Sequence, residues 1–183
     1  MKFNGNNSVQ KCVLCGVLAA LLAVLSQVSI PLPIGVPVTL QTFAVALCGY
    51  VLGPAMGTAA VGVYLALGAV GLPVFAGFSG GFGAFLGMTG GFLWGFLPMA
   101  LLCGLGLRGG KAIAIALGTV GLAACHLCGC VQFALVASMP FPQAFLTASA
   151  PFLIKDVVSV ALAYFAALAV TASIKKAGLG GAA

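Results

Sequence analysis

Continuous apolar runs constrain the fold of this chain more than any other feature of its sequence. A membrane-spanning helix needs about 20 mostly apolar residues, whereas a transmembrane strand alternates apolar and polar residues over about 10 positions. The runs here are continuous rather than alternating, so the pattern predicts an all-α integral membrane protein. We expect one domain, 1–183, with six transmembrane helices at 12–30, 38–53, 56–71, 90–107, 111–138 and 151–173.

Charged side chains are nearly absent. They make up 4% of the 183 residues, with seven Lys and Arg and a single acidic residue, Asp156, whereas soluble domains carry about 25%. The positive charges are too few and too scattered to form a nucleic-acid-binding face. We therefore expect the helices to be surrounded by a lipid bilayer and expect no nucleic-acid partner.

Proline and glycine separate the apolar runs. The prolines of PLPIGVP end the first helix, and Gly53-Pro54 separates the second from the third. The segment 72–91, LPVFAGFSGGFGAFLGMTGG, is called the glycine-rich loop below. It lacks the lysine of a phosphate-binding loop. Its phenylalanines predict an apolar re-entrant or lid-like loop, because irregular backbone at membrane depth must be buried or line a cavity.

The positions of the positive charges predict the orientation. Lys and Arg accumulate on the cytoplasmic side of membrane proteins. With six helices, both termini and the turn between the fourth and fifth helices share one side, and these places hold Lys2, Lys11, Arg108, Lys111, Lys175 and Lys176. The pattern therefore places both termini in the cytoplasm and the glycine-rich loop outside.

The exception is Lys155, which lies beside Asp156 at the outer end of the sixth predicted helix. A charge in a membrane span is costly and by default marks a functional site. The alternative is an ion pair at a helix end that reaches out to water. We expect Asp156 to face a ligand. Neighbours in a helix point about 100° apart, so Lys155 need not face the same pocket.

Two further groups of polar residues have the chemistry of a site. Thr39 and Gln41, near the outer end of the second predicted helix, can bind a ligand or cap that helix. In CHLCGC, Cys125 and Cys128 share a helical face but His126 points elsewhere, and a tetrahedral metal site needs four converging ligands. We therefore expect no metal and no cofactor, and a helix–helix contact for His126.

Enzymes and structural membrane proteins are the other classes to which the sequence can be compared. A single His and a single Asp, far apart in the sequence, indicate no hydrolytic triad, so we expect no enzyme. A structural membrane protein, or a membrane thiol or metal protein centred on CHLCGC, stays open as an alternative. Ala19 and Ala23 form a small-xxx-small pattern, which lets either a partner helix or one of the chain's own helices approach closely.

Several blocks together resemble the biotin-specific S component of energy-coupling factor (ECF) transporters. They are IPLPIGVPVTLQTFAVALCGYVLGPAMG, VYLALGAVGLPVFAGFSGG, GMTGGFLWGF and PFLIKD, and the resemblance extends over about residues 18–170. It implies a non-catalytic six-helix subunit in a prokaryotic cell membrane that captures biotin from outside. It also implies two kinds of partner, a transmembrane coupling subunit and a pair of ABC-type ATPases. A solitary carrier of biotin or of a biotin precursor is the alternative within transport.

The resemblance also implies roles for individual residues. Asp156 matches the family's acidic residue and would accept a hydrogen bond from the ureido ring of biotin, a charge-assisted and therefore strong bond. Ala19 and Ala23 match the family's docking face for the coupling subunit. The other residues that the matching blocks assign to the ligand site are Thr39, Gln41, Phe75, Thr89, Gly90 and Gly91.

The sequence departs from the family pattern at two places. The family commonly shows D-x-x-K, but Ser159 stands where that lysine would be. The family's G-P-T-G-G-Y motif is also changed, with Met88 in place of proline and Phe92 in place of tyrosine. We therefore expect Lys155 to take over the contact with the carboxylate of biotin. A close relative of biotin is the alternative ligand.

Overall fold

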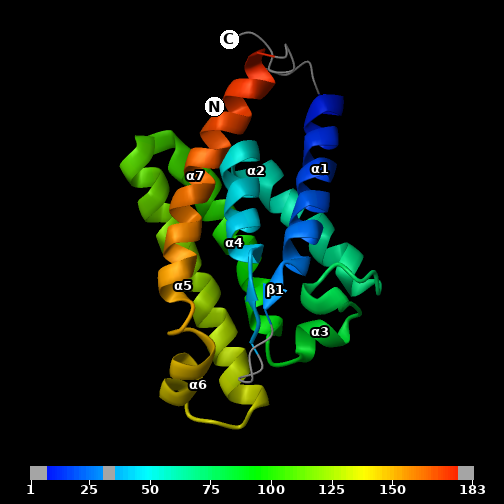
Figure 1. Cartoon of the computed structure of the whole chain (residues 1–183), viewed down its shortest axis with the longest axis vertical. Coiled ribbons are helices and arrows are strands. Elements are labelled where there is room, and N and C mark those ends of the chain that lie inside the picture. The colour runs from blue at the N-terminus through cyan, green and yellow to red at the C-terminus, as the bar shows by residue number, and fades with distance from the viewer. Residues whose placement is uncertain (1–7, 31–35, 177–183) are drawn as a thin grey trace.

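The computed structural model describes residues 8–30 and 36–176 and consists of long helices packed side by side (Figure 1). The helices and strands are α1 (Ser8–Gln27), β1 (Ser29–Ile30), β2 (Val38–Thr39), α2 (Gln41–Ala69), η1 (Ala76–Phe78), α3 (Gly83–Leu86), α4 (Gly90–Gly106), η2 (Leu107–Gly109), α5 (Gly110–Val136), α6 (Phe141–Ala148) and α7 (Leu153–Lys176). β1 and β2 pair antiparallel, with Ser29 opposite Thr39.

Helix α2 is two arms joined by a sharp turn at Gly53-Pro54. Gly53 has φ 78° and ψ −178°, which is not helical, and glycine is the residue that adopts positive φ most readily. A Cβ atom on Gly57 would lie 2.6 Å from the carbonyl oxygen of Cys48. In a straight helix these residues would be more than two turns apart, so the arms fold back against each other.

The six predicted segments correspond to α1, the two arms of α2, α4, α5 and α7. Within the described residues, four helical stretches are long and apolar enough to cross a membrane, namely 9–27, 41–69, 90–136 and 153–176. The second contains the turn at Gly53, and the third contains η2, which is followed by Gly110 with φ 85°. The short helices α3 and α6 were not predicted. Residues 38–39, predicted as helix, form β2 instead.

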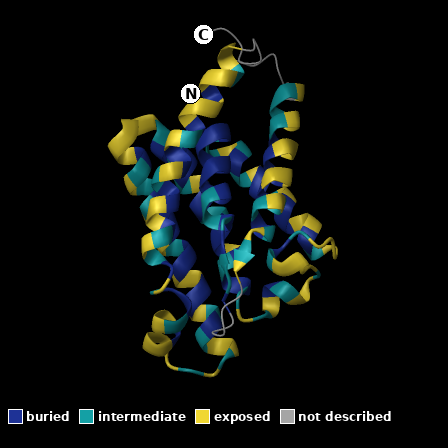
Figure 2. Ribbon diagram, viewed as in Figure 1, coloured by how far each residue is buried: buried dark blue, intermediate teal, exposed yellow. Residues whose placement is uncertain are grey.

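Buried residues lie between the helices and exposed residues lie on the outside of the bundle (Figure 2), and many residues of both kinds are apolar. The interior contains large buried side chains such as Tyr50, Tyr64, Leu22 and Met99. Many valines and leucines on the outer faces of α1, α5 and α7 are exposed. A surface of this kind is expected of helices that face lipid, because lipid tails do not penalise apolar exposure.

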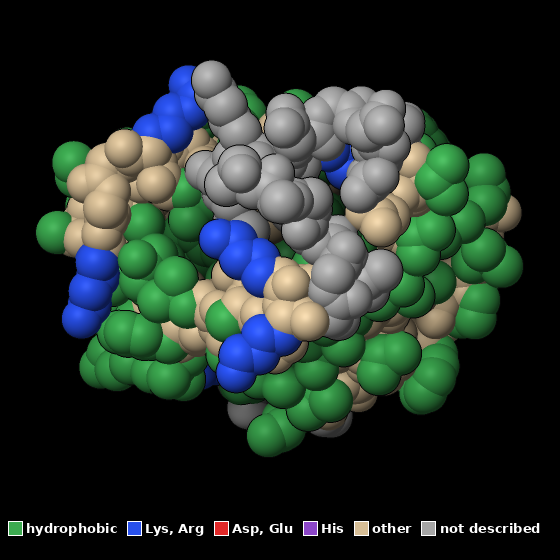
Figure 3. Space-filling view, turned by 90° about the horizontal axis from the view of Figure 1, so that it is seen from above, with side chains coloured by type: hydrophobic (Ala, Val, Ile, Leu, Met, Phe, Trp, Pro, Cys, Tyr) green, Lys and Arg blue, Asp and Glu red, His purple; other side chains and the backbone are tan. Residues whose placement is uncertain are grey.

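Positive charges gather at one end of the bundle (Figure 3). The start of α1, the α4–α5 turn and the end of α7 all lie at that end, and they carry Lys11, Arg108, Lys111, Lys175 and Lys176. The start of α7, which holds Lys155, lies towards the opposite end, together with α3 and α6. Lys2, which also entered the predicted orientation, lies outside the described residues.

Candidate ligand-binding site

A cavity of about 210 Å³ opens at the end of the bundle away from the positive charges. Seven segments meet there: residues 36–39 with β2, the start of α2, the glycine-rich loop, the start of α4, the middle of α5, the end of α6 and the start of α7. Its volume suits a small molecule. The lining residues are Val36, Pro37, Thr39, Gln41, Thr42, Phe75, Ala76, Ser79, Ala84, Thr89, Phe92, Leu93, Phe96, His126, Ala148, Phe152, Lys155 and Asp156.

Asp156 provides the cavity with its carboxylate, although the residue is only 3% exposed. It belongs to the first turn of α7, where the backbone N–H groups and the positive end of the helix dipole favour an anion. Thr42 donates its hydroxyl to Oδ1 across a distance of 2.5 Å. A buried carboxylate is tolerated only when its charge is balanced and its lone pairs are used, and α2 and α7 supply both conditions together.

Lys155 balances that charge from the neighbouring position. Its Nζ forms an ion pair with Oδ1 of Asp156 and donates to the carbonyl oxygen of Thr39 at 2.9 Å. The Oγ1 atom of Thr42 lies 3.5 Å from the same nitrogen. The three donors of the ammonium group therefore face protein acceptors, although the side chain is still 31% exposed. Both members of the pair line the cavity, which the sequence did not require.

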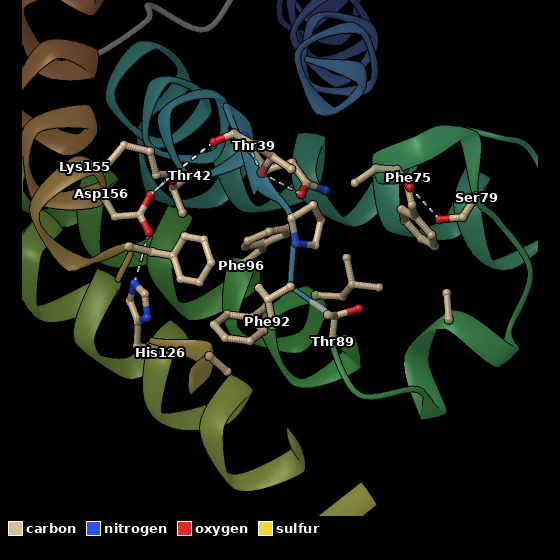
Figure 4. A pocket seen from close by; sticks show the side chains of 18 residues that line it. Thr39, Thr42, Phe75, Ser79, Thr89, Phe92, Phe96, His126, Lys155 and Asp156 are labelled. Atoms are coloured by element: carbon tan, nitrogen blue, oxygen red, sulfur yellow. Dashed lines mark hydrogen bonds and ion pairs between the residues drawn. The ribbon is translucent and has the colours of Figure 1, made fainter. Parts of the chain in front are cut away.

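His126 lies on the other side of the carboxylate (Figure 4). Its Nδ1 atom is 2.7 Å from the hydroxyl of Ser149, at the end of α6. Its Nε2 atom is 3.3 Å from Oδ2 of Asp156. The predicted helix–helix contact therefore exists, but the imidazole also borders the cavity. Both of its nitrogens face Ser149 and Asp156 rather than a cysteine. Cys128, the cysteine two residues further along the chain, is exposed.

Thr39 and Gln41 line the cavity and also organise the start of α2. The hydroxyl of Thr39 donates to Oε1 of Gln41 at 3.0 Å and accepts the backbone N–H of Gln41 at 3.3 Å. The Nε2 atom of Gln41 donates to the hydroxyl of Tyr64 at 2.8 Å. The capping and the cavity-lining interpretations therefore apply to the same two residues.

The glycine-rich loop folds onto the bundle rather than extending into solvent. Gln27, at the end of α1, donates to the carbonyl oxygens of Val74 and Phe75 and accepts the N–H of Phe78. These bonds tie the loop to the end of α1. Phe75 is thereby held in the cavity wall, where its ring packs edge-on against Tyr64 with centroids 5.4 Å apart.

Thr89 and the two glycines that follow it differ in whether they line the cavity. Thr89 lines the cavity, whereas Gly90 and Gly91 are not among the lining residues. A Cβ atom on Gly91 would lie 2.2 Å from the carbonyl oxygen of Cys128, and one on Gly90 would lie 2.5 Å from Nε2 of Gln132. These glycines therefore let α4 approach α5 closely, and ligand contact remains a prediction for them.

The two residues predicted to dock the coupling subunit, Ala19 and Ala23, differ in how far they are buried. Ala19 is 2% exposed and packs in the core, whereas Ala23 is half-buried. The exposed small residues on α1 are Gly16 and Ala20, which together with Ala23 follow one face of the helix. Ser159, which stands where a family lysine would be, is buried and does not line the cavity.

Among the lining residues that were not predicted to contact a ligand are Thr42, Phe92, Phe96 and His126. Phe92 and Phe96 lie one turn apart on α4, a spacing that places them on one face. Thr42 and His126 are polar residues within apolar helices. That rarity is the one signal that would have singled them out.

The BioY family model matches residues 1–176. A probable biotin transporter BioY from Pyrococcus horikoshii is 40% identical over 150 residues, which are 82% of this chain and 89% of the relative. The biotin transporter BioY from Thermotoga maritima is 43% identical over 123 residues, covering 66% and 72% of the two chains.

A solved structure gives the same result for the fold. The crystal structure of the S component for biotin from an ECF-type ABC transporter matches with a TM-score of 0.83 at 25% identity, and covers 91% of this chain and 93% of that one. The helices, the apolar surface and these relatives together make this a multi-pass membrane protein of the BioY family.

Proposed function

We propose that this chain is a biotin-binding S component that captures biotin in the cavity around Asp156. One observation carries the proposal: the single acidic residue of the chain is buried in the wall of a small-molecule cavity. A structural membrane protein would have no need for that arrangement. The names of the family members and of the matching structure support biotin as the ligand.

The chemistry of biotin suits the cavity walls. The ureido ring carries two N–H donors, and Oδ2 of Asp156 is an acceptor that neither Thr42 nor Lys155 occupies. The thiophane ring and the valeryl chain need apolar contacts, which Phe92 and Phe96 supply. Apolar walls with a few placed polar groups are the usual design of small-molecule sites.

The role proposed for Lys155 follows from its contacts. Its ammonium group already faces Asp156 and Thr39, so we assign to it the holding of the Asp156 carboxylate and the balancing of its charge, in place of the contact with the biotin carboxylate expected from the sequence. The valeryl carboxylate then extends away from this pair towards the side of the cavity where Thr89 and Ser79 lie (Figure 4).

The orientation in the membrane follows from the charged end. The positive-inside rule places the end that carries Lys11, Arg108 and Lys175 in the cytoplasm. The cavity then faces the outside and captures biotin there. Inward delivery is driven by a coupling subunit and two ABC-type ATPases. The coupling subunit docks on the face of α1 formed by Gly16, Ala20 and Ala23.

The proposal is tested with purified protein in detergent and with cells. Radiolabelled biotin should bind saturably at one site per chain, and unlabelled biotin, but not thiamine or riboflavin, should displace it. Uptake by cells should require the co-expressed coupling subunit and ATPases. If the protein binds biotin and cells take biotin up without these partners, the protein is a solitary carrier. Absence of biotin binding by folded protein would overturn the proposal.

A further inference from the structure

The imidazole of His126 has one nitrogen that the protein leaves without a hydrogen bond. Nε2 is buried, and within the described residues it has no hydrogen-bond partner. It lies 3.3 Å from Oδ2 of Asp156, but the approach does not meet hydrogen-bond geometry. Buried polar atoms are nearly always satisfied, and an exception calls for an explanation. His126 is itself only 5% exposed and lines the cavity.

The surroundings fix the orientation of this ring and favour one tautomer. The ring of Phe92 packs edge-to-face with the imidazole, at an interplanar angle of 89° and with centroids 5.8 Å apart. Ser149 contacts Nδ1 from the end of α6. A lone pair on Nε2 would lie beside the carboxylate of Asp156, whose Oδ2 atom is 3.3 Å away, and electrostatics disfavours that. The stable arrangement therefore has Ser149 donating to Nδ1 and a proton on Nε2.

Asp156 and His126 then present two complementary groups side by side. Oδ2 is an acceptor, because Thr42 and Lys155 use Oδ1. Nε2–H is a donor directly next to it. A ureido group has an N–H and a C=O adjacent on one edge, which is the matching pattern. Both side chains would gain a hydrogen bond that the protein itself does not supply.

We propose that His126 is a specificity-determining residue that donates from Nε2 to the ureido oxygen of the ligand, while Oδ2 of Asp156 accepts the adjacent ureido N–H. The inference rests on the proposed function and adds a second recognition group to it. It explains why a histidine stands within an otherwise apolar helix. The site binds a ligand ring that offers an N–H donor and a C=O acceptor side by side, and it binds weakly any ring that offers only one of them.

The test combines a changed ligand with a changed protein. In 2′-thiobiotin the ureido oxygen is replaced by sulfur, a weaker acceptor, while both N–H groups remain. Wild-type protein should bind biotin at least about tenfold more tightly than 2′-thiobiotin, the fold-change expected for one lost hydrogen bond in a buried site. In His126→Leu this preference should shrink towards one, because the donor is gone. His126→Gln, which keeps an N–H donor, should restore part of it.

A matched control lies on the same helix. The hydroxyl of Thr119 bonds only to the carbonyl of Ile115 in its own helix, outside the cavity, so Thr119→Val should retain the wild-type preference. If His126→Leu binds both ligands more weakly but keeps the wild-type ratio, His126 only supports Asp156 and the inference is wrong. An unchanged affinity and ratio would also overturn it.

Two controls separate this result from other failures. If wild-type protein does not bind biotin at all, the proposed function fails and the inference falls with it. If His126→Leu does not fold, the ratio is measured with His126→Gln and with the wild type. A wild-type ratio near one then contradicts the inference without any variant.

Discussion

Replacement of Asp156 by Asn removes one charge and changes almost nothing in shape. The carboxylate side chain is 5% exposed, accepts a hydrogen bond from Thr42 and pairs with Lys155. An amide oxygen can still accept from Thr42, but the Oδ2 atom that we assign to the ureido N–H is replaced by an NH2 group, which is a donor. A hydrogen bond to a charged group contributes about 1.5–3 kcal/mol. We therefore expect Asp156→Asn to weaken biotin binding by about 10- to 150-fold.

The same change affects the stability of the protein by a smaller amount. Removing one partner from a fully buried ion pair costs about 3–5 kcal/mol. The side chain of Lys155 is 31% exposed and can turn towards water. We therefore expect a loss of about 1–3 kcal/mol in the free energy of unfolding, less than for a fully buried pair. The folded variant remains available for binding measurements.

Isothermal titration of purified protein with biotin measures the effect on binding, and thermal unfolding in the same detergent measures the effect on stability. Thr171→Val is the matched control, because Thr171 lies on α7 and its hydroxyl bonds to carbonyls of its own helix, away from the cavity. That variant should bind biotin as the wild type does. An Asp156→Asn variant with wild-type affinity would refute the reasoning about the carboxylate.

Three further predictions test the roles of Lys155, of the glycine-rich loop and of the face of α1. Lys155→Met leaves the carboxylate of Asp156 buried without its cation and should lower the free energy of unfolding by about 3 kcal/mol, measured by chemical unfolding. The double variant with Asp156→Asn should recover part of that loss. A Lys155→Met variant as stable as the wild type would contradict the pairing. Gln27→Ala removes the bonds that tie the glycine-rich loop to α1 and should speed biotin dissociation several-fold in a chase experiment, whereas an unchanged rate would show that the loop does not close the cavity. Ala20→Leu should leave biotin binding intact but block uptake, whereas Ala19→Leu should overpack the core and destabilise the protein by about 1–3 kcal/mol; normal uptake by Ala20→Leu would place the docking face elsewhere.

Much of the fold follows from local features of the sequence. The apolar runs indicate the helices, and Gly53-Pro54 indicates the turn between the arms of α2, because proline and positive-φ glycine act on the backbone where they stand. The short helix α6 could not be recognised, since it has only eight residues and prolines stand both just before it and at its second position. The glycines after Thr89 look alike in the sequence, whether they shape a loop or allow close packing of helices.

The candidate site was predictable where a single residue breaks the pattern of its surroundings. Asp156 stands out as the only acidic residue, and the cavity contains it. His126 could not be connected to it, because the contact joins α5 and α7 and depends on how these helices pack. The face of α1 was equally hidden. That helix is apolar on all sides, so periodicity could not show that Ala19 faces inward and Ala20 outward.

A structure of the purified protein determined with bound biotin tests the central claim most directly. The account predicts one biotin molecule in the cavity, with a ureido N–H within hydrogen-bond distance of Oδ2 of Asp156 and the thiophane ring against Phe92 and Phe96. Biotin bound at another place, or in the cavity with its ureido ring turned away from Asp156, would contradict the account.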